Sequence, residues 1–135
     1  SKMTISGGCY CKKLRYLSTG IIQSSIQCHC RECQYITGGN ANTLVTVPIE
    51  TFEFTKGNPK SFERLDIKDP VKRFFCEDCG TAIGTKSPKR PGLMILKVGT
   101  FDDPSIFKPE IAIFTIDKQE FHHIADDVTQ FKKRP

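Results

Sequence analysis

Seven cysteines carry most of the chemistry that this sequence offers. Three of them, Cys28, Cys30 and Cys33, lie within one short segment, and spacings of two and three residues let their sulfurs converge on one point. Thiolates are preferred ligands of tetrahedral Zn²⁺, at about 2.3 Å from the metal. The segment 28–33 is therefore predicted to hold zinc with three protein ligands, which leaves a fourth position open for chemistry.

The other four cysteines come as two pairs, and two pairs make one closed four-thiolate site. They are Cys9, Cys11, Cys76 and Cys79. The seven cysteines thus divide into a closed, structural zinc site and an open site of three. Their spacings and odd number favour metal ligands over the alternative, a disulfide framework.

Length and composition predict one domain over residues 1–135, with ten Phe and three Tyr available for its core. No long apolar run or charged leader is evident, so we expect no membrane span and a reducing, cytoplasmic location. The formal charge of +5 falls to about +2 when seven thiolates and two Zn²⁺ are counted. Because the basic residues form no broad stripe, nucleic-acid binding is not expected.

Hydrophobic patterning predicts a mainly β fold of antiparallel sheets with few or short helices. A strand at 14–19 is expected to form a hairpin with 21–27 around Gly20, which delivers Cys28 at its end. The further expected strands are 43–47, 50–55, 61–67, 71–75, 82–86, 93–98 and 110–116. Of these, 61–67 and 71–75 are expected to pair.

Two glycine-containing segments flank the predicted ligands. A short helical turn over 30–37 would place Cys30 and Cys33 on one face, and Gly38-Gly39 follows either as its C-cap or as backbone that approaches a ligand. Residues 76–81 have the form of a zinc knuckle, in which Gly80 lets amide N–H groups face the thiolates.

With all seven cysteines placed, the sequence resembles the glutathione-dependent formaldehyde-activating enzyme family, which includes centromere protein V. The residues that carry the resemblance are Gly8-Cys9-x-Cys11, Leu14-Arg15-Tyr16, Cys28-His29-Cys30-x-x-Cys33 with Gly38, Arg73-x-Phe75-Cys76-x-x-Cys79-Gly80-Thr81 and Gly99-Thr100-Phe101-Asp102-Asp103-Pro104. They span nearly the whole chain in the right order. Lys12 stands where members often have glycine, and Phe121 where a tryptophan is common.

The resemblance implies a β-rich, tent-like fold of folded-over sheets with two zinc ions. It implies that the four paired cysteines hold a structural ion and that Cys28, Cys30 and Cys33 hold a catalytic one. The family reaction condenses glutathione with formaldehyde to S-hydroxymethylglutathione. An open three-thiolate zinc suits this chemistry, because it is a modest Lewis acid but holds a thiolate well.

The predicted function is therefore a zinc-dependent carbon–sulfur lyase that acts on a glutathione, or similar thiol, adduct of a small aldehyde. Arg31, Lys89 and Arg90 are candidates to meet the carboxylates of glutathione, although solvated surface charge is the commoner role. Glu32 is a candidate general base, with a solvated carboxylate on a helix face as the better-supported interpretation.

Other polar residues receive structural interpretations. His29 is expected to point away from the metal into a buried or supporting role, and His122-His123 fits no ligand spacing. Asp102-Asp103-Pro104 is interpreted as a turn with side-chain capping rather than a catalytic carboxylate pair. Phe121 is expected to anchor the tail.

Three competing functions fit parts of the pattern. One is a zinc-stabilised protein-interaction module without catalysis, in which the three-cysteine site is vestigial or closed by His29. A nucleic-acid or chromatin domain, suggested by residues 132–134 and by centromere protein V, ranks lower because acidic residues are interspersed. A thiol redox switch at the three-cysteine site would require labile zinc.

Overall fold

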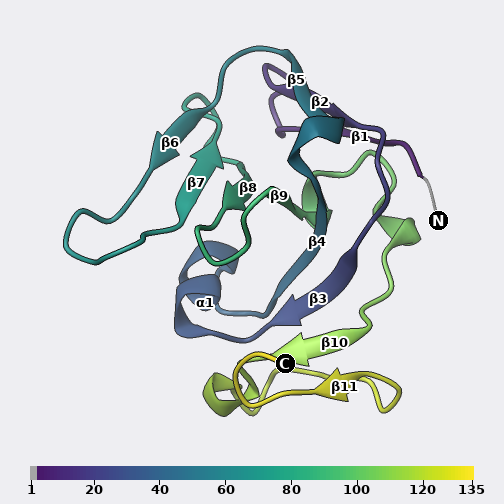
Figure 1. Ribbon diagram of the computed structural model, residues 1–135, viewed down its shortest axis with the longest axis vertical. Coiled ribbons are helices and arrows are strands. Elements are labelled where there is room, and N and C mark those ends of the chain that lie inside the picture. Colours follow the sequence, from purple (N-terminus) through teal and green to yellow (C-terminus); the bar gives the residue numbers. More distant parts are fainter. Residues whose placement is uncertain (1–2) are drawn as a thin grey trace.

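A computed structural model describes residues 3–135 of the chain, so Ser1 and Lys2 of the predicted domain lie outside the described residues (Figure 1). The strands are β1 (Ile5–Gly8), β2 (Arg15–Ser18), β3 (Ser24–Cys28), β4 (Asn42–Pro48), β5 (Phe52–Lys56), β6 (Lys60–Phe62), β7 (Lys72–Phe75), β8 (Ala82–Lys86), β9 (Leu93–Lys97), β10 (Ile111–Ile113) and β11 (Thr129–Gln130). The helices are α1 (Arg31–Thr37) and four 3-10 turns, η1 (Ile49–Thr51), η2 (Val98–Thr100), η3 (Pro104–Ile106) and η4 (Thr115–Asp117). The predicted mainly β fold with few, short helices is confirmed.

The strands form two sheets. A three-stranded antiparallel sheet has the order β1-β2-β5. An eight-stranded sheet has the order β11-β10-β3-β4-β9-β8-β7-β6 and is antiparallel except at β10, which runs parallel to both its neighbours. Figure 1 shows the small sheet at the top and β10 and β11 at the opposite end. None of the helices in residues 3–135 has the length and hydropathy needed to cross a bilayer.

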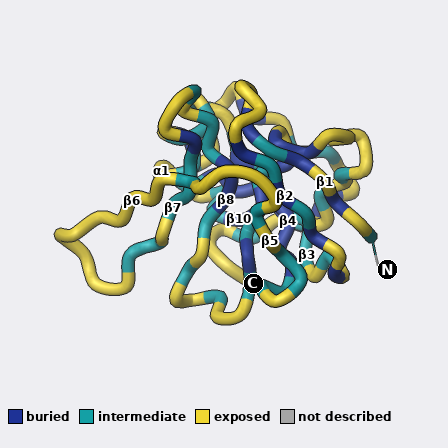
Figure 2. The backbone as a smooth tube through the Cα atoms, turned by 90° about the horizontal axis from the view of Figure 1, so that it is seen from above, coloured by how far each residue is buried: buried dark blue, intermediate teal, exposed yellow. Residues whose placement is uncertain are grey.

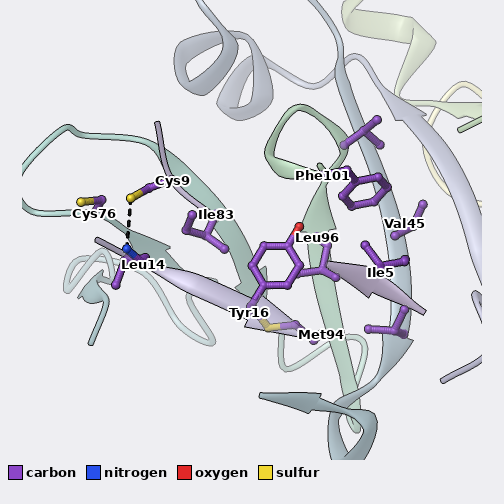
Figure 3. Packing of buried hydrophobic residues seen from close by; sticks show 12 residues of the cluster. Ile5, Cys9, Leu14, Tyr16, Val45, Cys76, Ile83, Met94, Leu96 and Phe101 are labelled. Carbon is purple, nitrogen blue, oxygen red and sulfur yellow. Dashed lines mark hydrogen bonds between the residues drawn. The ribbon is translucent and has the colours of Figure 1, made fainter. Parts of the chain in front are cut away.

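Two buried clusters lie on opposite faces of the large sheet. Because side chains alternate along a strand, Val45 and Val47 of β4 enter one cluster and Leu44 enters the other. The first cluster packs the small sheet against the large one, with Tyr16 of β2 beside Leu96 of β9 (Figure 3). The second cluster contains Ile26, Cys28, Leu44 and Ile113. It therefore surrounds the first of the three closely spaced cysteines.

The predicted hairpin between residues 14–19 and 21–27 is wrong. β2 pairs with β1 and β5, whereas β3 pairs with β4 and β10. The two strands bury their apolar side chains in different clusters, Tyr16 in the first and Ile26 in the second. Gly20 thus marks the point at which the chain leaves one sheet for the other.

The predicted strand 61–67 is too long, although its pairing with β7 is confirmed. Only Lys60–Phe62 is extended, and the chain then leaves the sheet as an exposed loop that Figure 2 shows as a projection. Within this loop Arg64 and Asp66 pair with each other at 2.7 Å instead of across a strand, and Leu65 is 95% exposed. An ion pair within the loop is therefore found where strand-to-strand hydrogen bonds were predicted.

The remaining predicted strands are present, with changes of a few residues at their ends. The largest change concerns the strand predicted over residues 110–116, because β10 covers only Ile111–Ile113. The strand stops there because Phe114 adopts a left-handed conformation, with φ of 54°, and begins the turn η4.

Candidate functional site

The four paired cysteines come together between two loops that are far apart in the sequence. Cys9 and Cys11 follow β1, Cys76 and Cys79 follow β7, and all four sulfurs lie within 4.8 Å of one another. The Sγ atoms of Cys9 and Cys11 are 3.6 Å apart. All seven cysteines of the chain are free thiols. This cluster could hold a metal ion.

Backbone and hydroxyl donors face these sulfurs, as expected at a thiolate site. The amide of Leu14 donates to Cys9 Sγ at 3.2 Å (Figure 3), and the Thr81 hydroxyl lies 3.2 Å from Cys79 Sγ. Hydrogen bonds from the hydroxyl and amide of Thr81 lower the pKa of Cys79 to about 5. Gly80 adopts the expected left-handed turn, with φ of 78°, so the predicted knuckle is present.

The second cluster is built where β3 meets α1. Cys28 ends β3, Cys30 is the N-cap of α1, and Cys33 lies in the first turn of the helix. Their sulfurs also lie within 4.8 Å of one another. The Cys30 sulfur accepts the helix-capping hydrogen bond from the Cys33 amide at 3.3 Å. Hydrogen bonds from Cys28 and Cys33 lower the pKa of Cys30 to about 2, so the cluster favours at least one thiolate.

This three-cysteine cluster opens into a cleft of about 660 Å³. The floor of the cleft is one face of the large sheet, where cross-strand pairing sets Cys28 beside Ile113 on β10 and Asn42 on β4. Leu44 and Ile26 form the next row of the floor. The walls are the start of α1, the loop after β6, the loop after β8 and the C-terminal segment.

The cleft is strongly cationic. Its seven basic side chains are Arg31, Lys68, Arg73, Lys89, Arg90, Lys133 and Arg134. Its acidic side chains are Glu32, Asp69 and Asp117. Positive charge therefore exceeds negative charge around the three thiols, which suits an anionic ligand.

A family model described as "Glutathione-dependent formaldehyde-activating enzyme" matches residues 4–117. The chain belongs to this family. None of the curated proteins shows significant sequence similarity to the chain. A similar solved structure is the crystal structure of a Rhodobacter sphaeroides protein, with 16% identity and a TM-score of 0.60. The similarity covers 74% of this chain and 88% of that chain, and at this identity it supports the fold alone.

In this member of the family, the three predicted cations all line the cleft. They are Arg31, Lys89 and Arg90. Arg90 is half-buried, and burial together with the nearby charge of Arg134 lowers its pKa. The Arg31 guanidinium donates to Gln34 Oε1 at 2.6 Å and lies over the Tyr35 ring. Arg31 is thus the most constrained of the three.

Glu32 is exposed on α1, as the helix-face interpretation expects, and it also forms an ion pair that the sequence did not indicate. Its carboxylate accepts from Arg73 at 2.7 Å. Because the carboxylate is already paired with a guanidinium, a role as general base is disfavoured. Gly38 is the C-cap of α1 with φ of 79°, and its amide bonds to Gln34, which supports the capping interpretation.

His29 is fully buried and both of its ring nitrogens have partners. The Gln27 amide nitrogen can only donate, so it donates to Nε2 of His29, which places the His29 proton on Nδ1. Nδ1 then donates to Nδ1 of His122 at 2.9 Å, and Nε2 of His122 donates to the Gly39 carbonyl at 2.8 Å. The expected burial of His29 is confirmed.

His122 is the partner that sequence reasoning missed, since nothing near it in the chain indicates a contact with His29. Phe121 was expected to anchor the tail, and that expectation is wrong because its side chain is 71% exposed. Its ring packs nearly perpendicular to that of His122, while the tail is held instead by backbone hydrogen bonds such as Phe131 N–H to the Ala112 carbonyl at 2.9 Å.

The carboxylates of Asp102 and Asp103 have separate structural roles. Asp103 accepts from the Ser105 amide at 3.1 Å, which confirms the predicted capping turn. Asp102 accepts two hydrogen bonds from Arg15, and this guanidinium lowers the pKa of the Asp102 carboxyl. The Asp102–Arg15 pair ties the end of η2 to β2.

Proposed function

We propose that this protein is, as a single domain, a cytoplasmic zinc-dependent carbon–sulfur lyase that acts on the glutathione, or similar thiol, adduct of a small aldehyde. One observation carries the proposal: three clustered thiols line a cationic cleft. The family description names glutathione dependence and formaldehyde activation, which supports these substrate classes.

The donor sets suit zinc, because both clusters offer only sulfur and one of them has a full set of four. Cys9, Cys11, Cys76 and Cys79 would hold a structural ion. Cys28, Cys30 and Cys33 would hold a second ion, and zinc there would offer a fourth position that favours the thiolate form of a substrate.

The proposed reaction is the reversible cleavage of a C–S bond. In cleavage, the C–S bond breaks with its electron pair moving to sulfur, and the hydroxyl proton is lost as the carbonyl forms. Glutathione carries two carboxylates, and the guanidinium of Arg90 with the ammonium of Lys89 would attract them into the cleft. The apolar floor, which includes Leu44 and Ile113, would limit water around the reacting carbon.

The alternative of an interaction module without catalysis is less well supported. That alternative predicts an extra ligand at the three-cysteine site, with no cleft above it. Instead the cluster opens into a cleft, and His29 directs both ring nitrogens to other partners.

The test is exchange NMR with ¹³C-formaldehyde, glutathione and the zinc-loaded protein. We expect interconversion of formaldehyde and S-hydroxymethylglutathione at least about tenfold faster than the spontaneous rate, an effect of roughly 1.4 kcal/mol on the barrier. Cys33→Ser, which leaves the four-cysteine cluster intact, should abolish the acceleration. Equal rates with the zinc-loaded wild type and with buffer would overturn the lyase assignment.

A further inference from the structure

Lys97 places a positive charge behind the three-cysteine cluster. It ends β9 and pairs across the sheet with Leu44, so its side chain lies on the face that forms the cleft floor. The side chain is half-buried, and this burial lowers its pKa, an effect that the nearby thiol of Cys33 partly opposes. Within residues 3–135 no carboxylate lies within 4.0 Å of its ammonium group; its partner is the side-chain oxygen of Asn42, at 2.8 Å.

Asn42 connects this ammonium group to the cluster. The residue is only 8% exposed and lies directly across the ladder from Cys28. Its amide nitrogen lies 3.7 Å from Cys33 Sγ, within the range of a hydrogen bond to sulfur. An ammonium can only donate and a thiolate can only accept, so the Asn42 amide satisfies both when its oxygen faces Lys97 and its nitrogen faces Cys33.

The net charge of the three-cysteine site with zinc explains why a cation beside it would be useful. Three thiolates with one Zn²⁺ carry a net charge of −1, and a substrate thiolate would bring it to −2. Charge accumulated in a partly buried site is costly unless an opposite charge lies close by. The Arg73 guanidinium is already paired with Glu32, and the Arg31 guanidinium donates to Gln34, so these two cations do not supply that charge as directly.

We propose that Lys97 and Asn42 are positioning residues that offset the negative charge of the three-cysteine site and thereby favour a thiolate as its fourth ligand. The part that concerns thiol binding rests on the proposed function. The part that concerns the three cysteine thiolates rests only on their ability to hold a metal ion. Two readouts on the zinc-loaded protein separate these parts.

The first readout is the rate at which a chromogenic chelator removes zinc. Lys97→Met should speed the release of one zinc about tenfold, since the cation that stabilises its thiolates is gone, and leave the other zinc unchanged. Asn42→Asp should behave like Lys97→Met, because the new carboxylate neutralises the ammonium and removes the N–H donor to Cys33. Lys97→Arg should release zinc at close to the wild-type rate.

The second readout is calorimetric binding of glutathione, with S-methylglutathione as a ligand that has no thiol. Lys97→Met should weaken glutathione binding about tenfold and leave S-methylglutathione binding unchanged, and Lys97→Arg should restore affinity. Lys108→Met, which removes a lysine paired with Asp127 on the surface, is the matched control.

Each outcome decides the proposal. The proposal would be overturned if Lys97→Met released zinc at the wild-type rate. It would also be overturned if every Lys97 variant released both zincs faster. Equal loss of affinity for the two ligands would overturn the role in thiolate binding. Failure of the wild type to bind glutathione would contradict the proposed function instead, while the zinc-release result would still decide the charge role of Lys97.

Discussion

Cys30 combines two roles in one sulfur atom. It is the N-cap of α1, where its side chain accepts from the Cys33 amide, and it is also a member of the three-cysteine cluster. The helix is only seven residues long, so a cap contributes a large part of its local stability. A metal ion bound by this cluster would therefore be coupled to helix initiation at this residue.

Two substitutions of Cys30 should separate these roles. Cys30→Ser keeps a good capping oxygen but removes a thiolate, whereas Cys30→Ala removes both, so both variants should lose the second zinc. Cys30→Ala should be less stable than Cys30→Ser by about 1 kcal/mol in urea unfolding. Two zincs per chain in Cys30→Ser, by elemental analysis, would contradict the ligand assignment.

From a distant part of the sequence, His122 contacts His29, the residue between Cys28 and Cys30. His122→Ala would leave the buried Nδ1–H of His29 and the Gly39 carbonyl without their partners, so we expect a loss of about 1–3 kcal/mol in urea unfolding. His123→Ala is the control, since His123 is exposed and it is its backbone carbonyl that accepts from Gln27. Equal stability of the two variants would show that the His29–His122 contact contributes nothing.

At the scale of elements, the cleft is assembled from pieces that no local pattern connects. The cysteine spacing within 28–33, the short helix and the knuckle were all predicted, because each depends on neighbours in the chain. The roles of Asn42, Lys97 and His122 were not predicted, because they depend on the register of β3, β4 and β9 and on the path of the C-terminal segment. The hairpin prediction was wrong for the same reason. Two apolar strands joined by a glycine look like a hairpin in the sequence even when they pack into different clusters.

The loop after β8 delivers Arg90 to the cleft, and its charge can be tested directly. Arg90→Gln should weaken glutathione binding about three- to tenfold by calorimetry, with the difference shrinking at high salt as the charges are screened. Arg64→Gln is the matched control, because Arg64 is paired with Asp66 on the projecting loop. Equal effects of the two substitutions would assign the binding to overall charge rather than to the cleft.

For the whole molecule, the two cysteine clusters lie in separate places, and the proposed function assigns a structural role to one and chemistry to the other. The four-cysteine cluster joins the turn after β1 to the knuckle after β7, and so ties the small sheet to the large one. The three-cysteine cluster lies on the opposite face of the large sheet, where the cleft is. Under the proposed function, this separation would let one site stay closed while the other faces the cleft.

This division predicts different costs for removing a cysteine from each cluster. Cys76→Ser should reduce the free energy of unfolding by roughly 3 kcal/mol or more, because Cys76 is buried and its cluster connects distant segments. Cys33→Ser should cost less, because its cluster spans only six residues of chain. Chemical denaturation of both zinc-loaded variants measures this, and the reverse order would contradict the assignment of structural and open sites.

The proposed function requires one zinc site with four sulfur ligands and another with three sulfur ligands plus an open position for a thiol. Zinc-edge X-ray absorption of the zinc-loaded protein measures these ligand numbers. We expect an average of about 3.5 sulfur ligands per zinc, the mean of four and three, rising to four when glutathione is added. A value near four before glutathione, or one that glutathione does not change, would contradict an open thiol-binding site.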